Sequence, residues 1–225
     1  MLYGLFIIFQ EDIYELRMIL WYIVNILLFL SFLLFLLKAK KLETKSQKNV
    51  YLGYGLFSLL FGLTRLFFIL SWLCGDAFEG CSDFYLILGY LIGTLATIII
   101  IYILETYLLK TKKILTGITI IVFCIILIAL FGLTSRGIAL TMIYILLPVV
   151  IGAISMSYIY FIIKSTGTSR KKAIGAFGGL LLLFIGHFMN TSFFNSMFPG
   201  TPGIISPIIM SAGIIIFMIT QLFIK

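Results

Sequence analysis

The stretch MILWYIVNILLFLSFLLFLL, Met18–Leu37, carries no charged side chain over its 20 residues. An α-helix rises about 1.5 Å per residue, so a helix of this length is about 30 Å long, which matches the hydrocarbon core of a bilayer. The run is followed by a polar and basic segment, Lys38–Lys48. The pattern predicts a helix that crosses a membrane and reaches water at Lys38.

Six more stretches have the same character, and polar or glycine-containing segments separate them. We expect the first ten residues, Met1–Gln10, to lie at the membrane interface. Ser206 followed by Pro207 is typical of a helix start, with serine as the N-cap and proline in the first turn. The sequence predicts an all-α integral membrane protein, a bundle of seven transmembrane helices in one membrane domain of residues 1–225. The expected spans are Met18–Leu37, Val50–Leu73, Phe84–Leu109, Ile114–Leu133, Leu140–Lys164, Lys172–Phe194 and Ser206–Phe223.

The composition excludes a soluble domain. Hydrophobic residues make up 62% of the chain and charged residues 11%, whereas soluble proteins average about 25% charged residues. The net charge of +8 would indicate nucleic acid in a soluble protein. Here the basic residues cluster at the ends of the expected spans, where they attract anionic lipid headgroups. We expect membrane lipid as a partner and no nucleic acid.

Lysine and arginine are concentrated in alternate connections. Connections on one side carry only Arg17 and Arg136, and short connections rich in basic residues face the cytoplasm. The pattern predicts an outside N-terminus and a cytoplasmic C-terminus in a multi-pass protein of the cell membrane. The expected cytoplasmic residues are Lys38, Lys40, Lys41, Lys45, Lys48, Lys110, Lys112, Lys113, Lys164, Arg170, Lys171, Lys172 and Lys225.

Cysteine usage agrees with this orientation. Cys74 and Cys81 both lie in the connection between the second and third spans, which the charge pattern places outside. An oxidising exterior permits a disulfide there, and the alternative is a pair of free thiols. We expect a Cys74–Cys81 disulfide, whereas Cys124 in the fourth span is expected to serve packing.

Arg65 is the residue that most strongly indicates a binding site. It lies inside the second expected span, and an arginine at the centre of a membrane helix costs about 2.5–3.5 kcal/mol on insertion scales. We therefore expect a polar pocket in the outer half of the bundle, with Arg65 as its charge. The other candidate ligand-binding residues lie at similar depth in other spans: Asn25, Tyr90, His187, Asn190 and Ser211.

Arg65 could also have a purely structural role, without a ligand. Its guanidinium can extend to the outer headgroups, or it can hold helices together on its own. We expect the side chain to point into the bundle, because its donors need acceptors from other helices. No carboxylate is expected at its depth, so its counter-charge is expected to come from an anionic ligand, a lipid headgroup, or an outer-loop acid such as Asp76 or Asp83.

Two features concern helix packing. Gly89 with Gly93, and Gly175 with Gly179, form GxxxG patterns, which are typical of membrane helices that approach closely. Glu105 lies near the cytoplasmic end of the third span. We expect it to form a helix-end ion pair with Lys110, Lys113 or Lys164.

Motifs of catalysis and metal binding are absent from the sequence. The chain has no GxSxG, no pair of intramembrane aspartates and no Cys/His dyad. His187 is its one histidine, which leaves no HExxH or other histidine-based metal site. We expect no enzymatic activity, no catalytic residue, no metal and no cofactor.

Three short motifs stand out in the second and third spans: Tyr54–Phe57 (YGLF), Phe61–Arg65 (FGLTR) and Glu105–Lys112 (ETYLLKTK). They resemble prokaryotic, archaeal-type standalone seven-transmembrane proteins, which are similar to the seven-helix sensor modules found ahead of histidine kinases. The resemblance implies a sensory role and no catalytic residues. Unlike the kinase-linked modules, this chain is expected to carry no output domain.

The sequence thus favours a receptor-like or sensory membrane module that binds a small or lipidic ligand in the outer half of the bundle. Such a module is expected to act through a protein partner on the cytoplasmic side or within the membrane. A channel or transporter for an anion or proton is one alternative, and a structural or accessory subunit of a membrane complex is another. The inner halves of the expected spans are mostly Ile, Leu and Phe, which disfavours a continuous polar path.

Overall fold

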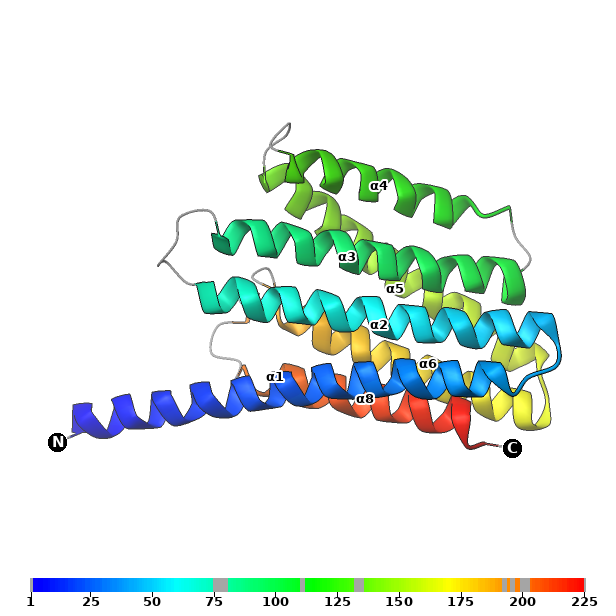
Figure 1. Cartoon of the computed structure of the whole chain (residues 1–225), viewed down its shortest axis with the longest axis horizontal. Helices are drawn as coiled ribbons and strands as arrows, with labels where there is room; N and C mark the ends of the chain where they lie inside the picture. The colour runs from blue at the N-terminus through cyan, green and yellow to red at the C-terminus, as the bar shows by residue number, and fades with distance from the viewer. Residues whose placement is uncertain are drawn as a thin grey trace.

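The computed structural model describes residues 2–74, 81–109, 112–131, 136–191, 194, 197–198 and 203–224, which are almost entirely helical and contain no strand (Figure 1). Six of the helices are long and apolar enough to cross a membrane, and α4 is a shorter apolar helix. The fold is that of an all-helical, multi-pass membrane protein with six to seven apolar helices. The elements are α1 (Leu2–Lys40), α2 (Lys45–Cys74), α3 (Cys81–Ile103), the π-helical turn η2 (Leu104–Leu109), α4 (Ile114–Leu130), α5 (Arg136–Lys164), α6 (Gly167–Met189) and α8 (Ile205–Leu222).

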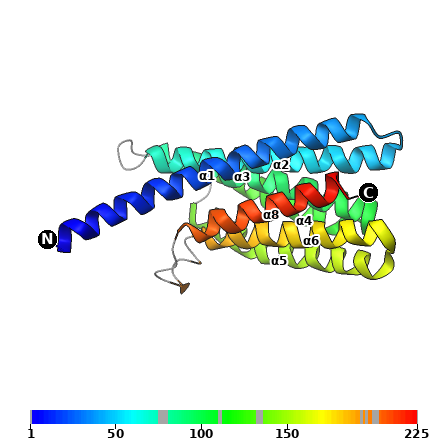
Figure 2. The same ribbon diagram turned by 90° about the horizontal axis from the view of Figure 1, so that it is seen from below.

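The helices form a ring in chain order. Each described helix packs against the next one along the chain, and α8 closes the ring by packing against α1. The most extensive contacts join α6 to α8, α2 to α3, and α1 to α2. The long axes of the helices run roughly side by side, and the two termini lie at opposite ends (Figures 1 and 2). The first turns of α1 extend past the rest of the bundle in both views.

Most helix ends differ from the predicted spans by one to five residues, and α1 begins much earlier than predicted. α1 begins at Leu2, so the segment predicted to lie at the interface continues the same helix as the first span. α6 ends at Met189 instead of near Phe194. The chain turns there because the backbone N–H of Asn190 donates to the carbonyl of His187 at 3.2 Å, which is a tighter turn than the α-helical one.

The start of α8 also differs from the prediction. Ser206 is not the N-cap, because α8 begins at Ile205 after Ile204, which offers no side-chain cap. The hydroxyl of Ser206 donates instead to the carbonyl of Gly186 in α6 at 2.6 Å. Ser206 therefore joins two helices rather than starting one.

α2 carries much of the aromatic interior. Phe57 and Phe61 stack with ring centroids 5.5 Å apart, and Phe184 of α6 packs against Phe61 at 6.2 Å. These three side chains are no more than 2% exposed. Toward the lysine-rich end, the hydroxyls of Tyr54 and Tyr158 share a hydrogen bond of 3.1 Å. Aromatic rings of α2 and α6 therefore pack against each other between the tyrosine pair and Arg65.

Glycine lets α6 and α8 pack with their backbones nearly touching. A Cβ atom added to Gly179 would lie 2.6 Å from the backbone nitrogen of Phe217, and one added to Gly213 would lie 2.6 Å from the backbone nitrogen of Leu183. Gly175 instead faces the side chain of Thr220 on α8. The close approach predicted from the GxxxG pattern of α6 is confirmed.

Glu105 caps the start of the next helix. Its buried carboxylate accepts hydrogen bonds from the backbone N–H groups of Leu115 and Thr116 at 3.0 and 2.9 Å, and from the Thr116 hydroxyl at 2.6 Å. These are among the first N–H groups of α4, which have no partner inside their own helix. Lys110, one of the lysines predicted to pair with it, lies outside the described residues. Glu105 therefore caps α4 from the π-helical turn at the end of α3.

We predict that Gly179→Ala destabilises the protein by about 1–3 kcal/mol, because the new methyl meets backbone atoms that cannot move aside. Gly178→Ala is the matched control, since a Cβ at Gly178 meets nothing within 4 Å. Unfolding of the purified protein in detergent measures both. Equal stabilities of the two variants would contradict the close helix contact.

Candidate functional site

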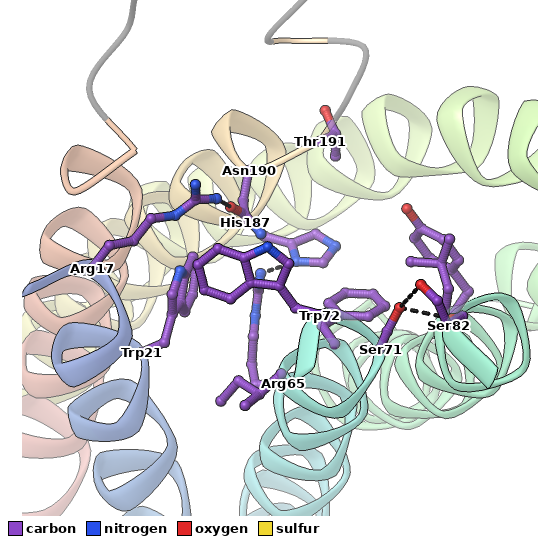
Figure 3. Close-up of a pocket in the computed structure, with 13 residues that line it drawn as sticks. Arg17, Trp21, Arg65, Ser71, Trp72, Ser82, His187, Asn190 and Thr191 are labelled. Atoms are coloured by element: carbon purple, nitrogen blue, oxygen red, sulfur yellow. Dashed lines mark hydrogen bonds between the residues drawn. The ribbon is translucent and has the colours of Figure 1, made fainter. Parts of the chain in front are cut away.

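A cavity of about 390 Å³ lies between α1, α2, α3 and α6, at the end of the bundle opposite the lysine-rich connections (Figure 3). Its volume falls in the range of about 300–1,000 Å³ that is typical of small-molecule sites. Both tryptophans of the protein line it. The lining residues are Arg17, Trp21, Arg65, Phe68, Ile69, Ser71, Trp72, Ser82, Leu86, Tyr90, His187, Asn190 and Thr191.

Arg65 reaches into this cavity from α2 and is 1% exposed. Its Nη2 donates a hydrogen bond to Nδ1 of His187 on α6. Arginine has no acceptor, so Nδ1 must accept, and the imidazole is then neutral with its proton on Nε2. The side chain thus points into the bundle and is held by another helix, as predicted.

Aromatic rings surround the Arg65 guanidinium. Its central carbon lies 4.6 Å from the ring centroid of Trp21, and Phe61 and Phe68 follow at 5.7 and 5.6 Å. Cation–π contacts contribute about 0.5–2 kcal/mol each, more when water is excluded. The rings stabilise the charge without neutralising it.

The hydrogen bonds of Arg65 are incomplete. Its Nε is buried and has no hydrogen-bond partner in the described part of the chain. No carboxylate among the described residues pairs with it; Asp83 is exposed, and Asp76 lies outside those residues. A buried guanidinium with a missing counter-charge favours a negatively charged occupant of the cavity.

Arg17 of α1 adds a second cation to the same cavity. Its Nη2 donates to Oδ1 of Asn190 at 3.3 Å, and its central carbon lies 4.9 Å from the ring centroid of Trp72. In Figure 3, Arg17 and Arg65 approach the end of α6 from two different helices. No aspartate or glutamate is among the described residues that line the cavity. Two arginines therefore lie on the same side of it.

The other half of the cavity is neutral. The hydroxyl of Ser71 on α2 donates to the carbonyl of Ser82 on α3 at 2.7 Å. The Cys74–Cys81 disulfide joins the same two helices just beyond these serines, and this predicted bond is confirmed. The disulfide and the serine pair hold the α2–α3 edge of the cavity in place.

The structure brings four of the six predicted ligand-binding residues together. Arg65, Tyr90, His187 and Asn190 all line the cavity. Asn25 does not, because it lies one turn further into the bundle than Trp21 and packs beside Gly62, whose added Cβ would lie 3.5 Å from Oδ1 of Asn25. Ser211 of α8 does not line it either.

Sequence reasoning misses several lining residues, namely Arg17, Trp21, Trp72 and the two serines. A signal for them is present in the sequence. Residues 17 and 21 in α1, 65, 68 and 72 in α2, and 82, 86 and 90 in α3 recur at the three- and four-residue spacing of a single helix face. In the sequence, Arg17 indicates only which side of the membrane the N-terminus faces. Aromatic residues near the ends of membrane helices usually lie at the lipid–water interface, so the tryptophans do not indicate a cavity.

A smaller void of about 40 Å³ lies deeper in the bundle, between α2, α3, α5 and α6. It shares Phe68, Tyr90 and His187 with the larger cavity, so these three side chains separate the two spaces. The remaining lining residues are Phe61, Thr64, Gly93, Thr94, Thr97, Ile143, Leu146, Val150 and Phe184.

The polar side chains that line the site offer mainly hydrogen-bond donors. In the described part of the chain, no group of three or more His, Cys, Asp or Glu side chains could hold a metal ion. The arginines, the neutral imidazole and the amide of Asn190 offer mainly hydrogen-bond donors. The site is therefore suited to an acceptor-rich, negatively charged ligand.

We predict that replacing both Cys74 and Cys81 with Ser lowers the free energy of unfolding by about 2 kcal/mol, because the disulfide closes a short loop in the unfolded chain. Reductant should have a similar effect on the native chain and none on the double variant. Intact-mass measurement after alkylation, with and without reductant, reports the bond. Two alkylated thiols in the unreduced native protein would contradict it.

Comparison of the chain with family models, curated proteins and solved structures finds no match. These comparisons therefore add nothing to the resemblance to seven-helix sensor modules. The features that bear on function are the cavity itself, its two arginines and the aromatic rings that surround them.

Proposed function

We propose that this chain is a receptor-like or sensory membrane module that binds a small or lipidic anion in the outer cavity and acts through a protein partner. The observation that carries the proposal is Arg65, a buried guanidinium at a cavity wall with no carboxylate partner among the described residues. Arg17 supports it because it adds positive charge to the same space. The proposal includes no enzymatic activity and no cofactor.

We also propose that all seven helices span the cell membrane, with the N-terminus outside and the C-terminus in the cytoplasm. The unequal distribution of lysine supports this orientation. The Cys74–Cys81 disulfide supports it independently, because disulfides persist on the oxidising side of a membrane. In this orientation the cavity lies at the outer end of the bundle and is supplied from outside or from the outer leaflet.

The orientation predicts which cysteines a membrane-impermeant thiol reagent labels in intact cells. A cysteine at Lys45 should label after lysis only, because the α1–α2 connection is cytoplasmic. A cysteine at Asp83, an exposed residue beside the disulfide, should label in intact cells. Both variants are made with Cys74, Cys81 and Cys124 replaced by Ser. Labelling of Lys45→Cys in intact cells would reverse the orientation.

The channel alternative finds less support in the packing. Phe57, Phe61 and Phe184 fill the bundle between the outer cavity and the tyrosine pair on the other side. An ion would lose its hydration there without gaining polar contacts, at a cost of several kcal/mol. A binding module needs no such path.

Binding of an anion can be followed by tryptophan fluorescence, because both tryptophans line the cavity. We predict that benzoate changes the emission saturably in the native protein and that benzylammonium does not, because the lining cations repel it. Arg65→Leu should abolish the benzoate response. Arg170→Leu is the control, since it removes an exposed arginine at the other end of the molecule.

The thermal stability of Arg65→Leu separates the ligand-binding role from a purely structural one. Replacing a buried charge by an apolar side chain of similar size is often neutral or stabilising. We expect the variant to fold and to lose benzoate binding. A large loss of stability, with no benzoate response in the native protein, would identify Arg65 as a residue that only holds helices together.

A further inference from the structure

We infer that the ligand is an amphipathic oxyanion, whose anionic head binds Arg65 and whose apolar tail extends into the inner void. The inference rests on the proposed function and specifies the class of ligand. An oxyanion of this kind is either a free organic acid or part of a membrane lipid. The larger cavity and the inner void share one wall, and this wall determines where the head and the tail of the ligand lie.

The hydrogen-bond partner that Arg65 lacks indicates the chemistry of the ligand's head group. Its Nη2 is used by His187, while its Nε has no hydrogen-bond partner in the described part of the chain. A carboxylate or phosphate oxygen is the acceptor that a guanidinium binds most strongly. The head must therefore lie beside Arg65, at the wall that His187 shares with the inner void.

The inner void is apolar in character although it contains three threonines. The hydroxyls of Thr64, Thr94 and Thr97 donate to the carbonyls of Leu60, Tyr90 and Gly93 in their own helices, at 3.0, 2.9 and 2.9 Å. Their hydroxyl protons are bonded within their own helices, and most of the remaining lining is Phe, Ile, Leu and Val. The void therefore offers a methyl or methylene group mainly apolar contacts.

Phe68 controls the passage between the two spaces. It borders both, and its ring lies over Gly89 of α3, where an added Cβ would come within 2.6 Å of the ring. The absence of a side chain at Gly89 gives the ring its position. The tail of the inferred ligand would pass Phe68 to reach the inner void, where Val150 lies on the wall.

The test uses straight-chain carboxylates from acetate to octanoate, titrated by tryptophan fluorescence into the full chain in neutral phosphatidylcholine nanodiscs. Affinity should rise about 4-fold for each added methylene while the tail is being buried. Val150→Phe fills the void and should remove the gain for the longer acids, while acetate binding stays unchanged. Val149→Phe is the control, because Val149 is the adjacent residue and is 47% exposed.

Thr97→Leu fills the same void from α3. It replaces Val150→Phe in the test if that variant does not fold. If affinity is independent of chain length, or if both filling variants bind octanoate like the native protein, the inner void is not a tail site and the inference fails. In that case the proposed function stands, because the carboxylates still bind. If no carboxylate binds, the proposed function fails as well.

A second arm separates the two sources of the oxyanion. Nanodiscs of phosphatidylglycerol replace the neutral ones, and octanoate is titrated again. A free acid as ligand predicts an unchanged octanoate affinity. A lipid as ligand predicts at least a 10-fold loss of apparent affinity, because the lipid occupies Arg65, and Arg65→Leu should abolish the difference in tryptophan emission between the two nanodisc types.

Discussion

The burial of the Arg65 guanidinium is the constraint on which the half of the bundle around the cavity depends. An unpaired charge in a low-dielectric interior costs several kcal/mol, so the surrounding residues must offset that cost. Aromatic faces from α1 and α2 do part of this, and His187 supplies one acceptor from α6. None of these groups is an anion, so the positive charge remains available to attract one. A carboxylate at the position of His187 would stabilise the arginine better and would remove that attraction.

The rest of the structure keeps this arrangement rigid. Gly179 and Gly213 let α6 and α8 meet backbone to backbone, which fixes the helix that carries His187 and Asn190. The Cys74–Cys81 disulfide fixes the outer ends of α2 and α3. At the opposite end, Glu105 ties the start of α4 to the end of α3. These contacts join helices directly, which matters in a membrane bundle because it lacks the hydrophobic driving force that packs soluble helices.

Much of this fold can be predicted from the sequence because a bilayer constrains it strongly. Apolar stretches of about 20 residues admit few structures other than helices. The residues of the site are harder to predict. The depth of a residue in the membrane follows from its position along the span, whereas the direction in which its side chain points depends on how the helices pack. Depth alone predicts that Arg65 and His187 meet, and they do, but Asn25 at similar depth faces Gly62 instead. The sequence does not predict that Glu105 caps α4, because the N–H groups that it binds come close to it only in the folded chain.

The distribution of side chains along α2 suggests how a bound ligand affects the rest of the molecule. Arg65 and Phe68 border the outer cavity, Phe61 lies at the aromatic layer, and Tyr54 bonds to Tyr158 of α5 near the other end. In the proposed receptor-like role, an anion bound at Arg65 changes the contact of Arg65 with His187 of α6. We expect this change to move α2 relative to α6 and so to reach the tyrosine pair. Ring contacts of Phe57 and Phe61 with Phe184 join α2 to α6, and the tyrosine pair joins α2 to α5. These are the contacts through which the proposed receptor-like role would act.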